Sequence, residues 1–202
     1  MLNDLKLLWS LREKPRSASR LFIVWAKRLI TFPALLKILT RIQLLRLRGA
    51  QIGRLVVIGQ AKFEGNLKYL KVGNGVSIGK CIITLHENVE IFDNSVISDG
   101  AVLLTASHKL RDHYWGGECK SLRFDKYSWV AVNSIILPGV SLGCGAVVGA
   151  GAVVRCNVPD YSLAIGNPAV IVNNKRVNEL KYSPSLLNAP LEAWVGPTKF
   201  IC

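Results

Sequence analysis

The chain lacks a long uncharged hydrophobic run, although half of its 202 residues are hydrophobic. The most apolar segment, residues 21–47, is interrupted throughout by Lys27, Arg28, Lys37 and Arg41. Since a transmembrane helix needs about 20 mostly uncharged residues, we expect none here. The apolar stretch from Leu5 to Leu11 is too short for a signal peptide. Aromatic residues are also scarce, at 8%, which suits a core of stacked aliphatic side chains.

Cysteine pairs with short spacing are missing as well. The five cysteines are odd in number, and none forms a CxxC pair (Cys81, Cys119, Cys144, Cys156 and Cys202). This pattern excludes a disulfide framework or a zinc knuckle. It favours a reducing compartment, so we expect a cytoplasmic protein.

Acidic residues are rare at the N-terminus. Residues 1–50 hold eleven Lys or Arg but only Asp4 and Glu13, a net charge of +9 out of +13 for the chain. We expect helices here, broken near Pro15 and restarting at Pro33, with one apolar face and one basic face. This basic amphipathic extension could cap the repeats, assemble the oligomer or lie peripherally on the inner face of a membrane. The interleaved Leu and Ile argue against nucleic-acid binding.

Large apolar side chains recur at every sixth position from residue 124 to residue 154: Phe124, Val130, Ile136, Leu142, Val148 and Val154. A small or β-branched residue follows each by four positions: Ser128, Ser134, Val140, Ala146, Ala152 and Val158. Six-residue repeats are typical of a parallel β-helix, in which each hexad is a short strand and a turn. Three hexads per triangular coil predict that residues eighteen apart stack.

The repeats divide the chain. We expect a helical extension at 1–50, a β-helix over 51–172 and a C-terminal tail at 173–202 with a short helix around Val177–Tyr182. Residues 109–123 have no hexad period and predict a loop extruded from the coil. Long loops in compact domains usually carry function.

Several motifs occur in a fixed order: glycine-led hexads, Ser107-His108 before the loop, the segment from Trp129 to Val140, and the Ile-Gly-Asn-Pro-Ala run at 165–169. In these the chain resembles the hexapeptide-repeat acyltransferases, closest to sugar and polysaccharide O-acetyltransferases. The resemblance implies an all-β, left-handed parallel β-helix and a homotrimer with sites between subunits. It implies acetyl-CoA as co-substrate, no metal, and direct transfer to a sugar hydroxyl of a glycan. The basic N-terminal block suggests that this glycan is a lipid-linked polysaccharide precursor.

His108 is the candidate general base, since imidazole can accept a hydroxyl proton near neutral pH. Counting back one coil of eighteen residues reaches Glu90, which we expect directly beneath His108 as its orienting carboxylate. Asp112 is a second candidate for that role. A surface histidine and a solvated glutamate are the alternative interpretations.

The resemblance also implies a binding site around the coils. The expected cofactor contacts are Val132, Ala150, Gly151 and Asn167, with phosphates held by Arg155, Lys175 and Arg176, although relatives often have a Lys or Arg where this chain has Val170. The expected acceptor platform is Trp129, Tyr114 and Trp115. The small residues could instead serve only the hexad geometry.

Two other function classes stay open. A γ-class carbonic anhydrase-like zinc protein would use His86, His108 and His113. A non-catalytic scaffold would use the basic N-terminus to reach a membrane surface.

Overall fold

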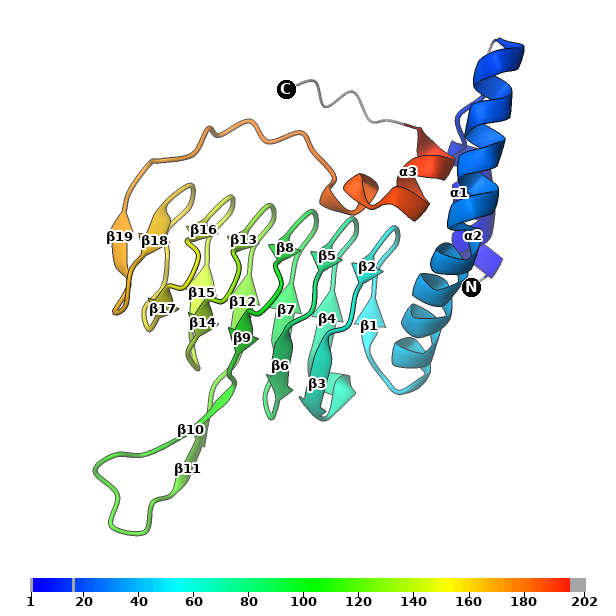
Figure 1. The fold of residues 1–202 in the computed structure, drawn as a ribbon. Coiled ribbons are helices and arrows are strands. Elements are labelled where there is room, and N and C mark those ends of the chain that lie inside the picture. The colour runs from blue at the N-terminus through cyan, green and yellow to red at the C-terminus, as the bar shows by residue number, and fades with distance from the viewer. Residues whose placement is uncertain (1, 16, 197–202) are drawn as a thin grey trace.

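A computed structural model describes residues 2–15 and 17–196. Parallel strands wind into a three-sided coil, with a helical unit at its N-terminal end (Figure 1). Sheet A contains β1 (Gln51–Ile52), β4 (Leu70–Val72), β7 (Val89–Ile91), β12 (Leu122–Phe124) and β15 (Ser141–Leu142). Sheet B contains β2 (Val57–Ile58), β5 (Ser77–Ile78), β8 (Val96–Ile97), β13 (Trp129–Val130), β16 (Val147–Val148), β18 (Leu163–Ile165) and β19 (Val170–Val172). Sheet C contains β3 (Lys62–Gly65), β6 (Ile82–Leu85), β9 (Val102–Leu103), β14 (Ile135–Ile136) and β17 (Val153–Val154). A one-turn helix, η1 (Leu67–Tyr69), follows β3.

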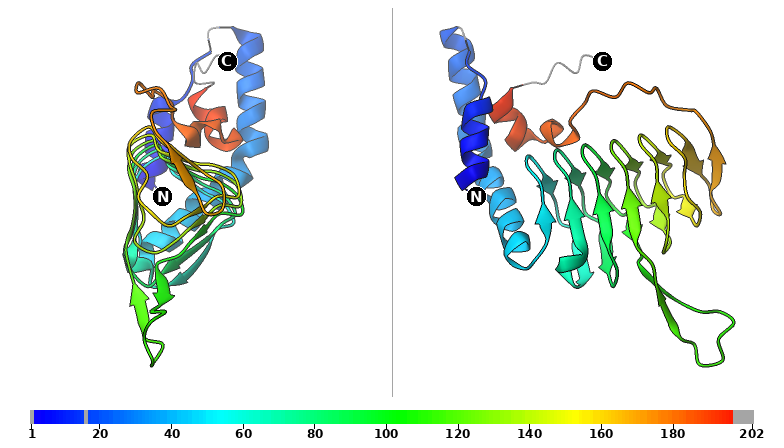
Figure 2. Two further views of the ribbon diagram at one scale, coloured as in Figure 1. Left: turned by 90° about the vertical axis from the view of Figure 1, so that its left-hand side faces the viewer. Right: turned by 180° about the vertical axis from the view of Figure 1, so that it is seen from behind.

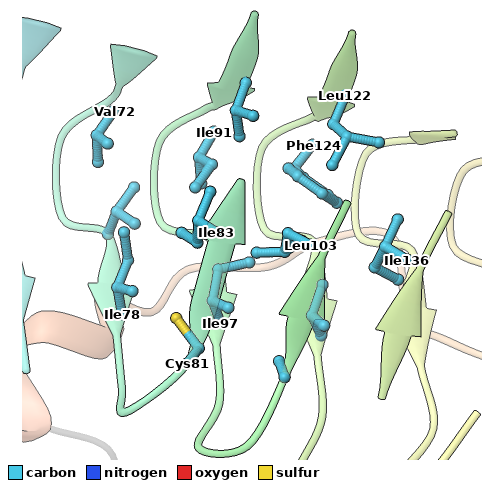
Figure 3. Packing of buried hydrophobic residues seen from close by; sticks show 14 of the residues in the cluster. Val72, Ile78, Cys81, Ile83, Ile91, Ile97, Leu103, Leu122, Phe124 and Ile136 are labelled. Carbon is cyan, nitrogen blue, oxygen red and sulfur yellow. The ribbon is translucent and has the colours of Figure 1, made fainter. Parts of the chain in front are cut away.

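The sixth-residue pattern makes the core, as predicted. All six large side chains from Phe124 to Val154 are fully buried, and the residues four positions later are buried at the corners. Figure 3 shows this stacking in the coils from Val72 to Ile136. The predicted fold class, a left-handed parallel β-helix behind a helical extension, is confirmed.

The coil length is constant only where the hexads are perfect. Phe124 pairs with Leu142, eighteen residues later, but Ile58 pairs with Ile78, twenty later. Coils before residue 100 therefore take nineteen or twenty residues, and the prediction of eighteen throughout is wrong. Longer corner turns absorb the extra residues without moving the buried positions.

Corner turns are fixed by side chains from the next coil. The Asp99 carboxylate accepts the Lys80 N–H at 2.6 Å. Gly79 leaves room for this contact, because a Cβ there would lie 2.1 Å from the Asp99 oxygen. Such contacts satisfy backbone groups that the short strands leave unpaired.

Two N-terminal helices close the first coil: α1 (Leu2–Leu11) and α2 (Ala18–Leu47). Ile42 and Leu45 of α2 join the solenoid core. Arg46 donates to the carbonyl oxygens of Ile52 and Gly53, so the exposed edge of β1 is covered. The predicted restart at Pro33 is wrong, since α2 runs through it. Figure 2 shows α2 changing direction along its length, and an interior proline is a common cause of such a bend.

The C-terminal tail runs back along the coils to the helical unit (Figure 1). The predicted helix at Val177–Tyr182 is wrong; helix occurs later, in η2 (Pro184–Leu187) and α3 (Ala189–Val195). Arg28 of α2 is buried and donates to the carbonyl oxygens of Ala193 and Trp194 at the end of α3. The tail thus docks on helices that precede the solenoid.

Within the described residues, no helix is long and apolar enough to cross a bilayer.

Candidate active site

The loop predicted at 109–123 is an antiparallel hairpin projecting from the coil (Figure 1). Its strands are β10 (Ala106–His108) and β11 (Gly117–Cys119), so ordered pairing starts before the predicted boundary. At its base, the buried Thr105 and Thr84 hydroxyls lie 3.1 Å apart, and each bonds the other's backbone. This contact anchors the hairpin on the coil below. His108 ends β10 and is exposed to solvent.

The His108 ring is held on two sides by Trp115. Its Nδ1 lies 2.9 Å from the Trp115 carbonyl oxygen. The two rings stack with centroids 3.9 Å apart and planes 12° apart. Because a carbonyl oxygen only accepts, neutral His108 carries its proton on Nδ1 and presents the Nε2 lone pair. That tautomer is the one a general base needs.

Asp112 organises the turn that presents this carbonyl. Its carboxylate accepts the N–H groups of Tyr114 and Gly116, each at 3.0 Å. Trp115 lies between them with φ of +50°, in the left-handed region. Asp112 therefore clamps both neighbours of Trp115, and it contributes to His108 orientation through the backbone rather than by direct contact.

Glu90 does not lie beneath His108, so that prediction is wrong. Its partners across sheet A are Lys71 and Arg123. Glu90 oxygens lie 2.9 Å from Lys71 Nζ and 3.5 Å from Arg123 Nη1. The nineteen-residue coil shifts the register, and His108 leaves the coil on the hairpin. Glu90 belongs to a charged ladder on the outside of sheet A.

The expected cofactor contacts gather at a different corner, between sheets B and C. The Gly151 N–H donates a hydrogen bond to the Val132 carbonyl oxygen at 3.0 Å, which joins the two residues. Ala150 is exposed beside them, and Asn167 follows β18 at the same corner. A Cβ on Gly151 would meet no atom within 4 Å, so the surface there is open.

Trp129 lies on the outside of sheet B next to this corner. Its ring is 42% exposed, and Nε1 donates to Ser98 Oγ at 3.1 Å. The sequence interpretation missed Ser98, because its coil partner becomes evident only from the β8–β13 register. This bond fixes the orientation of an indole that is partly exposed to solvent.

The structure separates the other predicted residues. Tyr114 and Trp115 lie on the hairpin, which leaves the coil at the corner between sheets C and A, and both are largely exposed. Arg155 follows β17 at this C–A corner. Lys175 and Arg176 lie instead at the A–B corner, where their backbone N–H groups donate to Tyr161 O.

Arg176 has a structural role in place of the predicted phosphate contact. The Arg176 Nη1 donates to the carbonyl oxygens of Tyr127 and Gly145, at 2.8 Å and 3.3 Å. Its other amino group bonds the Tyr182 hydroxyl. The guanidinium thus fastens the tail to the coil. The path of the tail over the A–B corner leaves no trace in the sequence, so these bonds could not be predicted from it.

Sheet C lies between the hairpin corner and the B–C corner. Its outward side chains form an aliphatic ladder in register: Ile82, Val102, Ile135 and Val153. A single chain therefore keeps His108 apart from Val132 and Ala150. A site that uses both groups needs a second chain.

The three histidines of the zinc alternative do not converge within one chain. Among the described residues, no group of three His, Cys, Asp or Glu side chains is placed to hold a metal ion. His108 uses Nδ1 for Trp115, whereas the His86 backbone N–H bonds Thr105 Oγ1.

The triangular coil, its extruded histidine and its open B–C corner define a hexapeptide-repeat protein with acyltransferase features. No family model matches the chain. It is 33% identical over 134 residues to the putative colanic acid biosynthesis acetyltransferase WcaF of Escherichia coli, covering 65% of this chain and 73% of WcaF. The chain belongs to the hexapeptide-repeat acetyltransferase family.

A second relative differs in length. The probable acetyltransferase Rv3034c of Mycobacterium tuberculosis is 33% identical over 138 residues, and the match covers 63% of this chain but only 45% of that protein. Among solved structures, a hexapeptide-repeat acetyltransferase of Vibrio cholerae, complexed with acetyl coenzyme A, aligns with a TM-score of 0.63 at 22% identity, over 84% of this chain and 97% of that one. A maltose O-acetyltransferase of Clostridium difficile has a TM-score of 0.63 at 21% identity, over 88% and 86% of the two chains. At these identities the two structures establish a shared fold.

Proposed function

We propose that this protein transfers an acetyl group from acetyl-CoA to a sugar hydroxyl of a glycan, with His108 as general base. Family membership supports acetyl transfer, and the names of WcaF and of the maltose enzyme support a polysaccharide or sugar acceptor. A lipid-linked polysaccharide precursor is the acceptor we favour. The free cysteines of the described region fit a reaction in the reducing cytoplasm.

The orientation of His108 carries the proposal. With Nδ1 bonded to the Trp115 carbonyl, Nε2 is free to take the proton of the acceptor hydroxyl. The sugar oxygen attacks the thioester carbon, the carbon–sulfur bond breaks, and the imidazolium returns the proton to the leaving thiolate. The products are an acetylated sugar and CoA, so the step balances without an acyl-enzyme.

The cofactor arm would lie along the B–C corner. Val132, Ala150 and Gly151 form an open surface there. The Gly151 N–H already bonds the Val132 carbonyl, so the N–H groups of Val132 and Ala150 are the ones that would stabilise the developing oxyanion. Trp129 offers an indole face to the acceptor sugar. Of the predicted phosphate contacts, the Arg155 and Lys175 side chains form no hydrogen bond or ion pair with the described residues, and Arg155 is the one we favour.

We propose that the active unit is a homotrimer. The aliphatic ladder on sheet C is a surface that a neighbouring chain can bury, unlike the charged outside of sheet A. Packing there would bring His108 of one chain toward the B–C corner of the next. Such a heterologous interface closes into a ring of three when a threefold rotation relates the copies.

His108→Asn tests the base directly. The Asn amide can still donate to the Trp115 carbonyl, so the hairpin is kept while the base is lost. We expect turnover of acetyl-CoA with a sugar acceptor panel to fall about 10²- to 10⁴-fold, the usual contribution of a general base. Turnover within threefold of the parent protein would rule out His108 as the base.

A further inference from the structure

The first half of α2 exposes an apolar surface to solvent. Phe22, Leu29 and Ile30 are 77%, 72% and 79% exposed. Further large apolar side chains surround them: Ile23, Trp25, Phe32 and Leu36. Figures 1 and 2 show this half of the helix standing clear of the coils. Contiguous exposed apolar side chains on a folded protein mark an interaction site.

The surface includes a defined hollow. Trp25, Leu29 and Phe32 of α2 and Trp194 of α3 line a cavity of about 200 Å³ with the stem of Arg28. The Arg28 guanidinium lies 5.0 Å and 5.2 Å from the Trp25 and Trp194 ring centroids. Rigid indole rings beside a cation are typical of protein surfaces that meet lipid headgroups.

Cations outnumber carboxylates around the surface, where Glu13 pairs with Arg20 at 2.7 Å and Glu192 of α3 lies near Lys27. No Asp or Glu occurs between Glu13 and Glu64. Lys27 and Lys37 are exposed on α2 itself, and Arg20 is exposed but paired with Glu13. A second copy of this face would bring like charges together, which opposes self-association. An anionic surface would gain attraction from each cation.

We propose that this face of α2 (Phe22, Ile23, Trp25, Leu29, Ile30, Phe32 and Leu36) docks on an anionic lipid bilayer. The helix lies in the interface with its apolar side chains among the lipid chains and its cations at the headgroups. Docking does not depend on the acetyl-transfer chemistry, so each can fail without the other.

Flotation with vesicles tests the contact on the full chain. The probes are phosphatidylcholine vesicles with and without phosphatidylglycerol. We expect binding to the anionic vesicles, and a loss of about tenfold or more in the triple variant Phe22→Ser, Leu29→Ser, Ile30→Ser. The matched control, Val177→Ser with Leu187→Ser, replaces two comparably exposed residues of the tail and should bind like the parent protein.

Three results would overturn the proposal. The first is no flotation of the parent protein with anionic vesicles. The second is binding that does not depend on charge. This would appear as equal binding to vesicles without phosphatidylglycerol, or as unweakened binding of the double variant Lys27→Gln, Lys37→Gln to the anionic vesicles. The third is a smaller assembly in sedimentation velocity for the triple variant with unchanged flotation, which would assign the face to a second copy. If the triple variant misfolds, the same contact can be tested by the quenching of tryptophan fluorescence with brominated lipid. We expect this quenching to be weaker in Trp25→Phe than in the parent protein.

Discussion

The Asp112 clamp gives a graded prediction about catalysis. Asp112→Ala removes the acceptor for the Tyr114 and Gly116 N–H groups, both at 3.0 Å. The hairpin is largely exposed, so water replaces part of each bond, and we assign about 0.5 to 1 kcal/mol to each. Losing both bonds therefore destabilises the ordered turn by about 1 to 2 kcal/mol.

That energy sets the size of the kinetic effect. A change of 1.4 kcal/mol corresponds to about tenfold in the ratio of ordered to disordered turn, and the ordered population falls by the same factor where the disordered turn dominates in the variant. We therefore expect kcat to fall about 5- to 30-fold in Asp112→Ala, with little change in the KM for acetyl-CoA. This loss is smaller than the one expected for His108→Asn, because the base is still present and only its orientation becomes rarer.

Two measurements distinguish this mechanism from others. CoA release should be followed by chromatography, since exposed Cys119 and Cys156 would react with a thiol reagent. Hydrogen exchange should show faster exchange at Tyr114 and Gly116 in the variant. Glu118→Gln, which breaks the hairpin ion pair with Lys120, is the matched control and should keep both properties.

Two outcomes would refute the reasoning. A loss in Asp112→Ala as large as in His108→Asn would mean that Asp112 acts on the reacting atoms. Faster exchange with unchanged kcat would mean that the turn does not orient the base.

Three further predictions concern stability and assembly. Arg28→Ala should lower the free energy of unfolding by about 2 to 4 kcal/mol and expose the tail to protease. The substitution removes the buried donor of three carbonyl oxygens, those of Glu13, Ala193 and Trp194. An unchanged urea midpoint would contradict this prediction. Burial, helped by Asp99, raises the pKa of the Cys81 thiol from 9.0 to about 12, so Cys81 should resist iodoacetamide at pH 8 while Cys119 and Cys156 react. The Cys81 thiol ionises at lower pH in the unfolded chain than in the folded protein. The stability that the buried thiol contributes is therefore complete below pH 9 and is lost as the pH rises toward 12. This loss should be absent in Cys81→Ala. Ile135→Asp, on the outside of sheet C, should reduce the mass of the assembly in light scattering and reduce activity together, whereas an active monomer would contradict a site shared between chains.

The hexad pattern predicted the core because burial in a coil is local. Each large side chain at position one points inward whatever the rest of the chain does, so Phe124, Ile136 and Val154 could be placed from spacing alone. The same logic identified the break after His108, where the period stops. It failed for Glu90, because stacking depends on the length of every intervening turn.

Other features depended on contacts between distant segments. Nothing in the sequence near Arg176 shows that it bonds Tyr127 and Gly145, and the tail helix α3 is stable where it packs on α1 and α2 rather than where its propensity is highest. The partner of His108 is a backbone carbonyl, which has no residue identity to read. The sequence alone therefore determined the triangular coil and the break in it after His108, since these follow from local periodicity. Only the tertiary structure decided how His108 is oriented and how far along the coil surface the B–C corner lies from it, since turn lengths and long-range docking set both.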